Sequence, residues 1–516
     1  MQRCCGRPAM LALLAAALPA AAANPVRVEL ATVGPDFAQW VVDTDGPATV
    51  AVAVLTPDGE IPASVDAVKG RYFRARVADL TPGQDYRVRV IMDGLEVPAS
   101  DFAPASFRTL EPPPGRLLFR FATVTDTHVG EEVAGLVGGL GYQGFSWPDP
   151  DHPYWRFTNE AAVREINASG VEFVIHKGDL TAEARPEEMV LAKTIFDGLR
   201  MPWHPVRGNH DRVRGGVDDW AAALGLARSW RALDFRGHRF LLLDTVAPET
   251  GAGWLGDDQL AWVEAELADA RASLRPIWVV GHHALCEEAG PLYAVLGDAL
   301  FRVQDAMDQA APAVVGVLAG HSHRNARLDA LMVPGVPFVE TASTKEYPGT
   351  WTEVRVFEGG FMQIAHVIDC PECREWYAIT TGEYGGNAPA MQFGRLEDRC
   401  FTVVFDPSLG QSASADDDSP PERDPQDDAF SDLTGGTEAD VGSPDPEGGL
   451  PLDGDAPPRG GSCMVAARVS DAGKTVLVGW LVLGSLLGSR RRPDPSGSRQ
   501  GPGPGFRHRP GIGLPD

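Results

Sequence analysis

Apolar, strand-like runs alternate with helix-like stretches from Leu117 to about Val367, and this alternation strongly constrains the fold. Strands are expected at residues 117–124, 172–175, 203–207, 239–244, 277–280 and 314–319. Helices are expected near residues 159–169, 186–199, 257–272 and 299–309. Strands that alternate with helices build layered α/β domains, because the helices cover the faces of the sheets. The sequence therefore predicts such a domain over residues 116–368.

Five short polar motifs directly follow apolar runs of this region. They are Asp126-Thr-His128, Gly178-Asp179, Gly208-Asn209-His210-Asp211, Gly281-His282 and Gly320-His321-Ser-His323. The carboxyl ends of strands gather at one edge of a layered α/β fold, and sites form there. Glycine lets the backbone turn sharply at such points. We therefore expect the motifs to converge, with enough oxygen and imidazole ligands to hold two metal ions side by side.

The order of these motifs resembles that of the calcineurin-like metallophosphoesterases. That family carries Asp-x-His, Gly-Asp, Gly-Asn-His-Asp/Glu, Gly-His and Gly-His-x-His, and all five occur here in the same order. The stretch 254–262 also resembles a helix start that is common in the family. The resemblance implies a four-layer α/β/β/α metallophosphoesterase domain.

The resemblance also implies which side chains would bind the ions. Asp126, His128 and His323 would bind the first ion. Asn209, His282 and His321 would bind the second ion, and Asp179 would bridge both. Oxygen and nitrogen ligands of this kind suit iron, manganese or zinc, divalent or trivalent, and do not distinguish between them.

The implied reaction is hydrolysis of a phosphomonoester or a phosphodiester. Two ions about 3.5–4 Å apart lower the pKa of a shared water, so that a metal-bound hydroxide is available near neutral pH. In the family, His210 would not be a ligand but a catalytic group beside the leaving group, which it steadies or protonates. The expected partner is therefore a phosphate-ester substrate.

The sequence departs from two better-defined branches of the family. Members often place an acid three residues after the bridging aspartate to orient the catalytic histidine, but that position here is Ala182. Either Glu183 or Asp211 can be considered as its substitute. Purple acid phosphatases carry an N-terminal β-sandwich and a tyrosine iron ligand after Gly-Asp, and no tyrosine follows Asp179 closely. The domain order resembles those enzymes, but their iron–tyrosinate colour is not expected.

Several other polar residues near the motifs have a structural and a functional interpretation. His283 follows His282 and is expected to point away from it, and His176, His204 and His238 fit ordinary strand or turn positions. Phosphate binding is possible for three arginines that flank motifs, although a structural role is favoured: Arg207, Arg212 and Arg324. The glycine- and aromatic-rich insertion at 135–155 fits either a lid or a packed surface loop.

Residues 25–110 are predicted to form a small β-sandwich. Val- and Thr-rich runs with alternating apolar positions predict strands at 40–42, 48–55, 72–77 and 86–91. The segment from Leu80 to Tyr86 resembles the corner of fibronectin type III domains, where a tyrosine bonds back to the backbone. Pro112-Pro-Pro-Gly115 then predicts a stiff linker.

Length and charge limit the remaining interpretations. A chain of 516 residues is too long for one compact core. The net charge of -26 offers no basic footprint, so nucleic-acid binding is not expected. Much of this charge lies in residues 406–461, which have almost no large apolar side chains and are predicted to form a disordered acidic linker.

The two ends of the sequence predict export and anchoring. Residues 1–23 have the basic start, apolar core and alanine-rich end of a secretory signal. Residues 463–492 combine Cys463, an apolar run and three arginines, and resemble the C-terminal sorting signals of myxobacteria. The apolar run is short for a spanning helix of about 20 residues, so a chance apolar patch remains the alternative. We expect an exported protein at the cell surface or outer envelope, held by the envelope membrane, with a disordered tail at 493–516.

A cysteine-containing extension follows the motif region at residues 369–405. It holds Cys370, Cys373 and Cys400, and export would permit one disulfide among them. The pair Cys370 and Cys373 also fits half of a zinc site, but a second pair is missing. The pairing stays open at this point.

A different class of function also fits the domain order. A catalytically weak or inactive adhesion or receptor protein can use a metallophosphoesterase fold as a scaffold on the cell surface. The complete set of ligands argues against such decay, so we favour the exported hydrolase.

Overall fold

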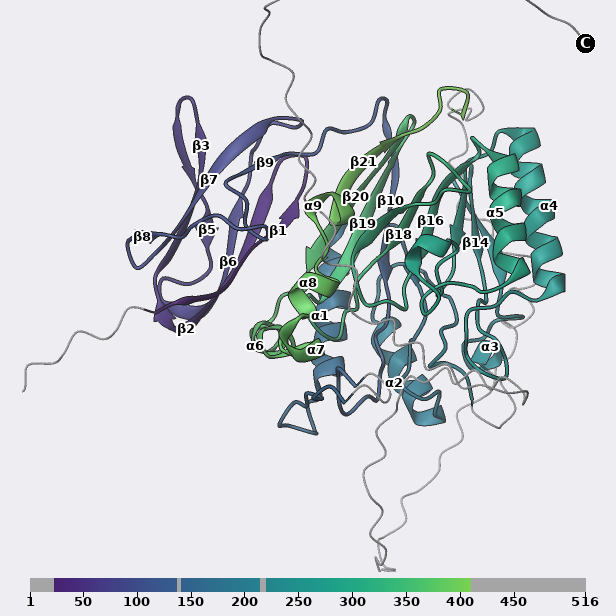
Figure 1. Cartoon of the computed structure of the whole chain (residues 1–516), viewed down its shortest axis with the longest axis horizontal. Helices are drawn as coiled ribbons and strands as arrows, with labels where there is room; N and C mark the ends of the chain where they lie inside the picture. The colour runs from purple at the N-terminus through teal and green to yellow at the C-terminus, as the bar shows by residue number, and fades with distance from the viewer. Residues whose placement is uncertain (1–22, 137–140, 214–219, 410–516) are drawn as a thin grey trace, which may run out of the picture. The chain divides into compact units, whose positions relative to one another are not determined.

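The computed structural model describes residues 23–136, 141–213 and 220–409 (Figure 1). Residues 1–22 of the predicted signal, most of the acidic linker, the anchor segment and the tail lie outside the described residues. Within the described ranges, no helix combines the length and apolar character that crossing a membrane requires.

The N-terminal region consists of two antiparallel sheets. The first has the order β1 (Pro25–Val33), β2 (Ala38–Ala48), β6 (Gly70–Val77) and β5 (Ser64–Val65). The second has the order β4 (Gly59–Pro62), β3 (Val50–Thr56), β7 (Asp85–Met92) and β8 (Leu95–Glu96), and β9 (Ser106–Arg108) also pairs with β7. Trp40, Val52 and Phe73 are buried in one core cluster between these strands. The hydroxyl of Tyr86 accepts a hydrogen bond from the backbone N–H of Thr81, at 2.9 Å, as the corner pattern predicts.

Two mixed sheets form the second region. One has the order β12 (Trp203–Pro205), β11 (Phe173–His176), β10 (Leu117–Val124), β19 (Thr350–Phe357), β20 (Gly360–Val367) and β21 (Cys400–Val404). The other has the order β13 (Arg231–Phe235), β14 (His238–Leu242), β15 (Ile277–Val280), β16 (Val314–Ala319), β18 (Pro337–Glu340) and β17 (Ala326–Asp329).

Alternation along β10 explains how the layers pack. Successive side chains of a strand point to opposite faces. Phe119 and Phe121 belong to the core cluster shared with the second sheet, where Phe121 meets Trp278 edge-on at 5.5 Å between ring centroids. Ala122 and Val124 belong to the cluster that holds the helices of the opposite face. The two sheets therefore pack against each other and carry helices on their outer faces.

The helices cover these outer faces in two groups. α1 (Tyr154–Ser169) and α2 (Pro186–Phe196) share a core cluster with the first sheet. α4 (Asp257–Ser273) and α5 (Asp298–Ala310) lie side by side against the second sheet (Figure 1). Shorter helices are α3 (Trp220–Ala223) and the 3₁₀ turn η1 (Glu287–Ala289). The predicted strands at 277–280 and 314–319 have the bounds of β15 and β16, whereas α1 begins at Tyr154, before the expected start.

The extension after residue 368 packs onto the first sheet. It contains α6 (Pro371–Thr380), α7 (Glu383–Gly386), α8 (Ala388–Gln392), α9 (Leu396–Arg399) and β21, which pairs with β20. Contacts with β1 also reach this region, since the guanidinium of Arg399 donates to the carbonyl oxygen of Leu30 at 3.0 Å. The extension therefore adds a strand to the sheet whose strands β10, β11 and β12 lead into three of the polar motifs.

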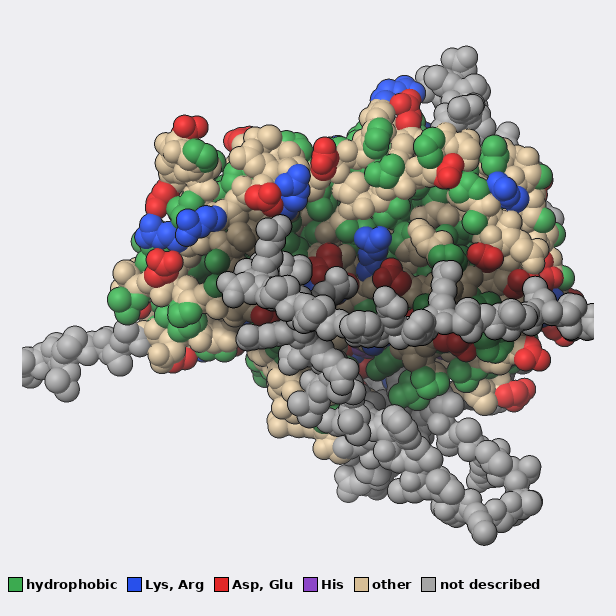
Figure 2. Space-filling model, turned by 45° about the horizontal axis from the view of Figure 1, so that its top comes forward, with side chains coloured by type: hydrophobic (Ala, Val, Ile, Leu, Met, Phe, Trp, Pro, Cys, Tyr) green, Lys and Arg blue, Asp and Glu red, His purple; other side chains and the backbone are tan. Residues whose placement is uncertain are grey.

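Acidic and basic side chains are intermixed over the visible part of the face drawn in Figure 2. Many of them form ion pairs across neighbouring elements, such as Arg302 with Glu264 at 2.8 Å. Exposed pairs of this kind contribute about 0–1 kcal/mol each. The packing of the sheets, rather than these pairs, therefore holds the motif-bearing strand ends in place.

Candidate metal centre

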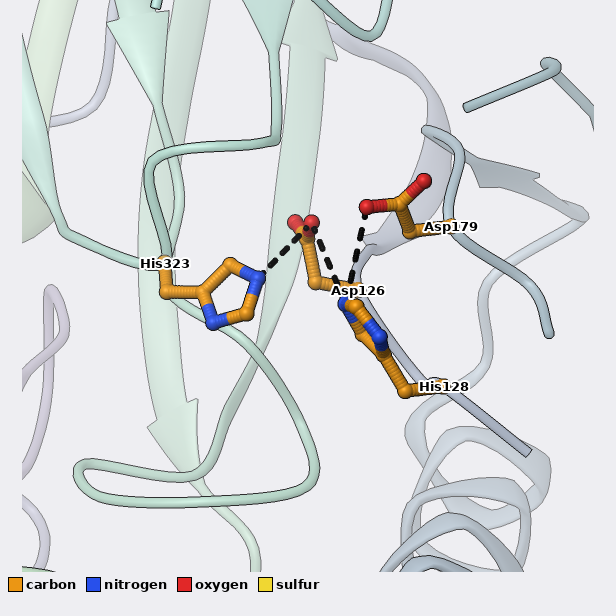
Figure 3. Close-up of side chains that lie close together, drawn as sticks. All are labelled: Asp126, His128, Asp179 and His323. Atoms are coloured by element: carbon orange, nitrogen blue, oxygen red, sulfur yellow. Dashed lines mark ion pairs between the residues drawn. The ribbon is translucent and has the colours of Figure 1, made fainter. Parts of the chain in front are cut away.

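The five motifs converge at the carboxyl ends of the strands, as predicted. Two groups of side chains present ligand atoms within 4.8 Å of one another. The first group is Asp126, His128, Asp179 and His323 (Figure 3), and the second is Asp179, His282 and His321. The amide oxygen of Asn209 lies 3.0 Å from Nε2 of His282 and so borders the second group. Asp179 is common to both groups, which places two candidate ion positions next to each other.

Most of these side chains come from residues in an uncommon backbone conformation. Positive φ angles, between 41° and 66°, occur at Asp126, His128, Asp179, His321 and His323. Residues other than glycine rarely adopt this left-handed region, which costs of order 1–3 kcal/mol for each residue. The strands end just before these positions, and the turn aims each side chain at the centre. The strain is therefore concentrated where the chemistry would occur.

The motif glycines permit the close approach of the loops. A Cβ atom on Gly208 would lie 2.1 Å from the backbone nitrogen of Asp179 and 2.2 Å from its Oδ1 atom. A Cβ atom on Gly178 would lie 2.4 Å from Nδ1 of His282. All three distances are far inside contact range, so neither position has room for a larger side chain without movement of a candidate ligand.

The first group contains buried ligand atoms without a hydrogen-bond partner. Oδ1 of Asp126 and both ring nitrogens of His128 are buried and have no hydrogen-bond partner among the described residues. Nε2 of His323 lies 3.2 Å from Oδ1 of Asp126, and Nε2 of His128 lies 3.5 Å from Oδ2 of Asp179. Buried polar atoms normally have partners, because leaving them unpaired is costly. A cation between these atoms would satisfy them, so the residues fit a metal ion.

The other oxygen of Asp126 is already engaged. Its Oδ2 atom accepts hydrogen bonds from the Thr125 hydroxyl at 2.6 Å and from the His321 backbone N–H at 3.0 Å. The carboxylate is thereby fixed, and only Oδ1 is left to face an ion. This is the arrangement expected for a ligand that is held by its surroundings.

The histidines of the second group are oriented by backbone carbonyls. Nδ1 of His282 lies 2.9 Å from the carbonyl oxygen of Lys177, which leaves Nε2 to face Asp179 at 3.3 Å. Nε2 of His321 lies 3.1 Å from the carbonyl oxygen of Leu292, which leaves Nδ1 for an ion. Oδ1 of Asp179 also accepts from the His210 backbone N–H at 2.7 Å. Each ring therefore has one nitrogen bound to the protein and one that is available.

The charges in this centre shift the pKa values of its histidines. Burial would lower the pKa of His282, but the carboxylates of Asp179 and Asp126 outweigh it and raise that pKa to about 9. Burial would also lower the pKa of His323, but the carboxylates of Asp126 and Glu346 outweigh it and raise that pKa well above its usual range. Burial lowers the pKa of His321 to about 4. Without ions, the raised pKa values favour protonated His282 and His323, so metal binding must displace these protons.

His210 is oriented by a group that the sequence did not predict. Its Nδ1 atom lies 2.7 Å from the backbone carbonyl oxygen of Ala182, and its ring lies 4.5 Å from that of His128 between centroids. The side chains considered as replacements for the missing acid are occupied elsewhere. Asp211 accepts backbone hydrogen bonds from Leu180, Thr181 and Gly208, and Glu183 pairs with Arg185. The prediction that Glu183 or Asp211 replaces the missing acid is therefore wrong, because the carbonyl oxygen of Ala182 contacts Nδ1 of His210 instead.

The flanking arginines are held by protein groups. Arg207 pairs with Asp244 at 3.2 Å, and Arg324 pairs with Glu340 at 2.7 Å. Arg212 donates to the carbonyl oxygen of Pro248 at 3.2 Å. These contacts favour the structural interpretation of all three side chains.

The other histidines near the motifs have partners or lie in apolar surroundings. His283 contacts the Thr245 hydroxyl through Nδ1 at 3.0 Å, and His176 contacts the Thr127 hydroxyl through Nε2 at 3.0 Å. Burial lowers the pKa values of His204 and His238 to about 3, which keeps both rings neutral. Their positions on β12 and β14 agree with the ordinary strand roles predicted for them.

Sequence reasoning missed the charged residues behind His323. Nδ1 of His323 lies 2.5 Å from Oε1 of Glu346, which in turn contacts Lys345. Glu346 follows β18, outside every motif, and is brought to His323 by the pairing of β18 with β16. No local pattern could have identified it, because only the tertiary fold joins these two residues.

The cysteines of the extension are assigned by the structure. Cys370 and Cys373 form a disulfide at the start of α6, and Cys400 is buried and free. The sulfur of Cys370 also accepts a hydrogen bond from the backbone N–H of Cys373 at 2.9 Å, as an N-cap does. With both sulfurs bonded to each other, the half zinc site considered for this pair does not form.

Comparisons with known proteins agree with the fold and the site. Residues 119–325 match the family described as Calcineurin-like phosphoesterase. The matched stretch contains all five motifs and agrees with the family that the motifs resemble. Over 176 residues the chain is 29% identical to the glycerophosphodiester phosphodiesterase GpdQ of Enterobacter lignolyticus (strain SCF1). This match covers 32% of the chain and 61% of that relative, so the chain spans less than two thirds of its length.

Solved structures give more distant likenesses. A dimetal phosphatase from Danio rerio is 13% identical with a TM-score of 0.40, and the match covers 49% of this chain and 98% of that one. The purple acid phosphatase PPD1 from yellow lupin (Lupinus luteus) seeds is 13% identical with a TM-score of 0.37. That match covers 75% of this chain and 76% of the lupin enzyme.

Proposed function

We propose that this protein is an exported phosphoesterase that uses two metal ions to hydrolyse a phosphomonoester or a phosphodiester. The observation that carries this proposal is the position of Asp179, whose carboxylate belongs to both groups of candidate ligands. A carboxylate shared between two adjacent ion positions is the arrangement that two-metal hydrolysis requires. The match of residues 119–325 to calcineurin-like phosphoesterases supports the same activity.

The chain's own residues have separate tasks in this proposal. Asp126, His128 and His323 would hold one ion, Asn209, His282 and His321 would hold the other, and Asp179 would be shared between them. When bound, the two ions supply Lewis-acid activation of water and neutralise charge on the phosphoryl group. The ligand set suits iron, manganese or zinc.

His210 is proposed to act on the leaving group. Its Nδ1 atom is held by the Ala182 carbonyl oxygen, so Nε2 is the nitrogen that can face a substrate. A protonated His210 can then donate its Nε2 proton to the departing oxygen. The fixed orientation of the ring would limit the entropy lost on reaching the transition state.

The substrate class is open between monoesters and diesters. The name of the matched relative, a glycerophosphodiester phosphodiesterase, supports including diesters in the first assays. p-Nitrophenyl phosphate and bis-p-nitrophenyl phosphate distinguish the two, with iron, manganese or zinc supplied one at a time. The ratio of the two turnover rates would define the preference.

The substitution Asp179→Asn tests the two-metal proposal. The amide lacks the charge needed to bridge two cations, so metal content should fall from two ions to fewer than one and turnover by about 10²–10³-fold or more. Asp234→Asn on β13 is the control, because Asp234 forms a partly exposed ion pair with Arg239. Wild-type turnover in Asp179→Asn would rule out the proposal. Stable metal-loaded wild-type protein without turnover of either ester would instead favour the adhesion or receptor alternative.

Export and anchoring remain part of the proposal. The sequence pattern of residues 1–23 supports a secretory signal, and the Cys370–Cys373 disulfide fits an oxidising compartment. Residues 463–492 are proposed to tether the chain to the envelope membrane, and residues 25–110 to form a fibronectin type III-like sandwich. Fractionation of cells, with mass spectrometry of the mature N-terminus, tests the location. Recovery of unprocessed protein from the cytoplasm alone would contradict it.

A further inference from the structure

His323 stands between two carboxylates that face opposite nitrogens of its ring. Nε2 lies 3.2 Å from Oδ1 of Asp126, and Nδ1 lies 2.5 Å from Oε1 of Glu346. An ionised carboxylate can only accept a hydrogen bond, so Nδ1 of His323 must donate to Glu346. This leaves Nε2 to face the first candidate ion position, beside Asp126 (Figure 3).

Glu346 is itself held by a buried cation. Its other oxygen, Oε2, accepts from the Lys345 Nζ atom at 3.0 Å, and the two side chains are only 1% and 2% exposed. Lys345 also donates to Oε2 of Glu131 at 2.5 Å. Both oxygens of Glu346 are therefore engaged, one by the lysine and one by the histidine. The carboxylate has no freedom to turn away from His323.

The backbone around Glu346 is fixed by helix α6 of the extension. The indole N–H of Trp376 donates to the carbonyl oxygen of Lys345 at 2.5 Å. The hydroxyl of Tyr377 donates to the backbone carbonyl oxygen of Thr344 at 2.8 Å. Thr380 accepts from the backbone N–H of Tyr347 at 3.0 Å. Three side chains of one helix thus hold the segment 344–347. This gives the carboxylate a rigid support, which precise orientation of a ligand requires.

We propose that Glu346 fixes the tautomer and the ring orientation of His323, and so acts as a positioning residue for the binding of the first metal ion. Glu346 does not itself face the ion, and it acts only through the histidine. This inference rests on the proposed two-metal function, because it assigns a role around one of its ligands. It also means that the extension, through α6, helps to position a candidate metal ligand, a role that the motifs alone do not reveal.

The decisive measurement is metal affinity rather than activity. Metal-free protein is titrated with Zn²⁺ or Mn²⁺ against a chromophoric chelator. In Glu346→Gln, the amide offers a single acceptor oxygen for which Lys345 and His323 compete, so His323 loses its fixed tautomer. Loss of such a partner typically weakens metal binding by about 10–100-fold. We expect this loss for one of the two ions, with the other bound as in the wild type.

Glu353→Gln provides a matched control. Glu353 is also a buried glutamate that contacts a histidine, with its Oε2 atom 3.3 Å from Nε2 of His366, and it also pairs with Arg355. It lies on β19, and its side-chain partners Arg120, Arg355 and His366 are not candidate ligands. A general loss of stability should appear in both variants, whereas loss of metal affinity should appear only in Glu346→Gln.

A double-mutant cycle tests whether Glu346 acts through His323. In the His323→Ala background, Glu346→Gln should cause no further loss of affinity. An equal loss with and without His323, or wild-type affinity in Glu346→Gln, would overturn the inference. Weak binding by the wild type itself would instead contradict the proposed function, so the two failures are distinguishable.

A second measurement does not require the Glu346→Gln variant. Histidine-selective ¹⁵N NMR of the zinc-loaded wild type reports which ring nitrogen of each histidine carries a proton. The His323 signals are assigned by their absence from His323→Ala. We expect a protonated Nδ1 and a metal-bound Nε2, and the reverse assignment would overturn the inference.

Discussion

Nδ1 of His210 lies 2.7 Å from the backbone carbonyl oxygen of Ala182. The proposed catalytic histidine is therefore oriented by a backbone carbonyl group, at a position where the alanine side chain offers no hydrogen-bond acceptor. A carbonyl oxygen can fix the orientation of the ring at Nδ1, as a carboxylate would.

Removing this histidine should slow catalysis and leave the ions in place. In His210→Ala, turnover should fall by about 10²–10⁴-fold, as for loss of a general acid. The loss should be larger for alkyl esters than for p-nitrophenyl esters, because poor leaving groups need the proton more. Rates on both ester types, with metal content measured in parallel, check this. Loss of an ion in this variant would show that His210 is a ligand instead.

A single methyl group at Gly208 should disrupt the bridge between the two candidate ion positions. The added Cβ atom would lie 2.2 Å from Oδ1 of Asp179, so the carboxylate or the loop has to move. Overpacking of this kind costs about 1–3 kcal/mol and here displaces a shared ligand. Metal content of Gly208→Ala should fall below two ions. Gly46→Ala is the control, since its Cβ atom has no neighbour closer than 3.8 Å, and two tightly bound ions in both variants would refute the prediction.

Glu165 should make the metal-free protein less stable as the pH rises. Burial raises its pKa to about 7, and Asp369 adds to this, although hydrogen bonds from Trp351 and the Asp369 backbone oppose it. The folded state therefore keeps a proton that the unfolded chain releases near pH 4.5. This contribution is fully present below about pH 4.5 and is lost as the pH rises through about 7, by about 3 kcal/mol.

Urea unfolding at a series of pH values checks this dependence. Glu165→Gln carries no titrating proton, so its free energy of unfolding should vary less between pH 5 and 8 than that of the wild type. The variant should be less stable at the acidic end, because one amide oxygen cannot accept from both Trp351 and Asp369. Parallel pH profiles for the two proteins would show that Glu165 has an ordinary pKa.

The contact between Tyr347 and Glu29 should couple the sandwich to the rest of the fold. The Tyr347 hydroxyl donates to Oε1 of Glu29 at 2.6 Å, and both side chains are buried. Tyr347→Phe would leave the carboxylate without this donor, at a cost of about 1–3 kcal/mol. The thermal midpoint should therefore fall, whereas Tyr72→Phe on a partly exposed sandwich tyrosine should have little effect. Equal midpoints for both variants would contradict the coupling.

Local sequence patterns were sufficient for the elements that carry the motifs. The apolar runs at 277–280 and 314–319 become β15 and β16 with those bounds, because each is buried on both faces and ends at a glycine. The strands β17 to β21 were not predicted. The short strand β17, for example, is only partly buried and owes its pairing to the neighbouring strand β18.

The sequence by itself determined the candidate ligands, because their residue types and the glycines beside them are local and specific chemistry. It could not determine how those ligands are held. The carbonyl oxygen of Ala182 belongs to the backbone and leaves no mark on residue identity. Glu346 reaches His323 only through the pairing of β16 with β18 and the packing of α6. These supports were decided by the tertiary structure, since hydrogen bonds between distant segments exist only once the sheets and the extension have packed together.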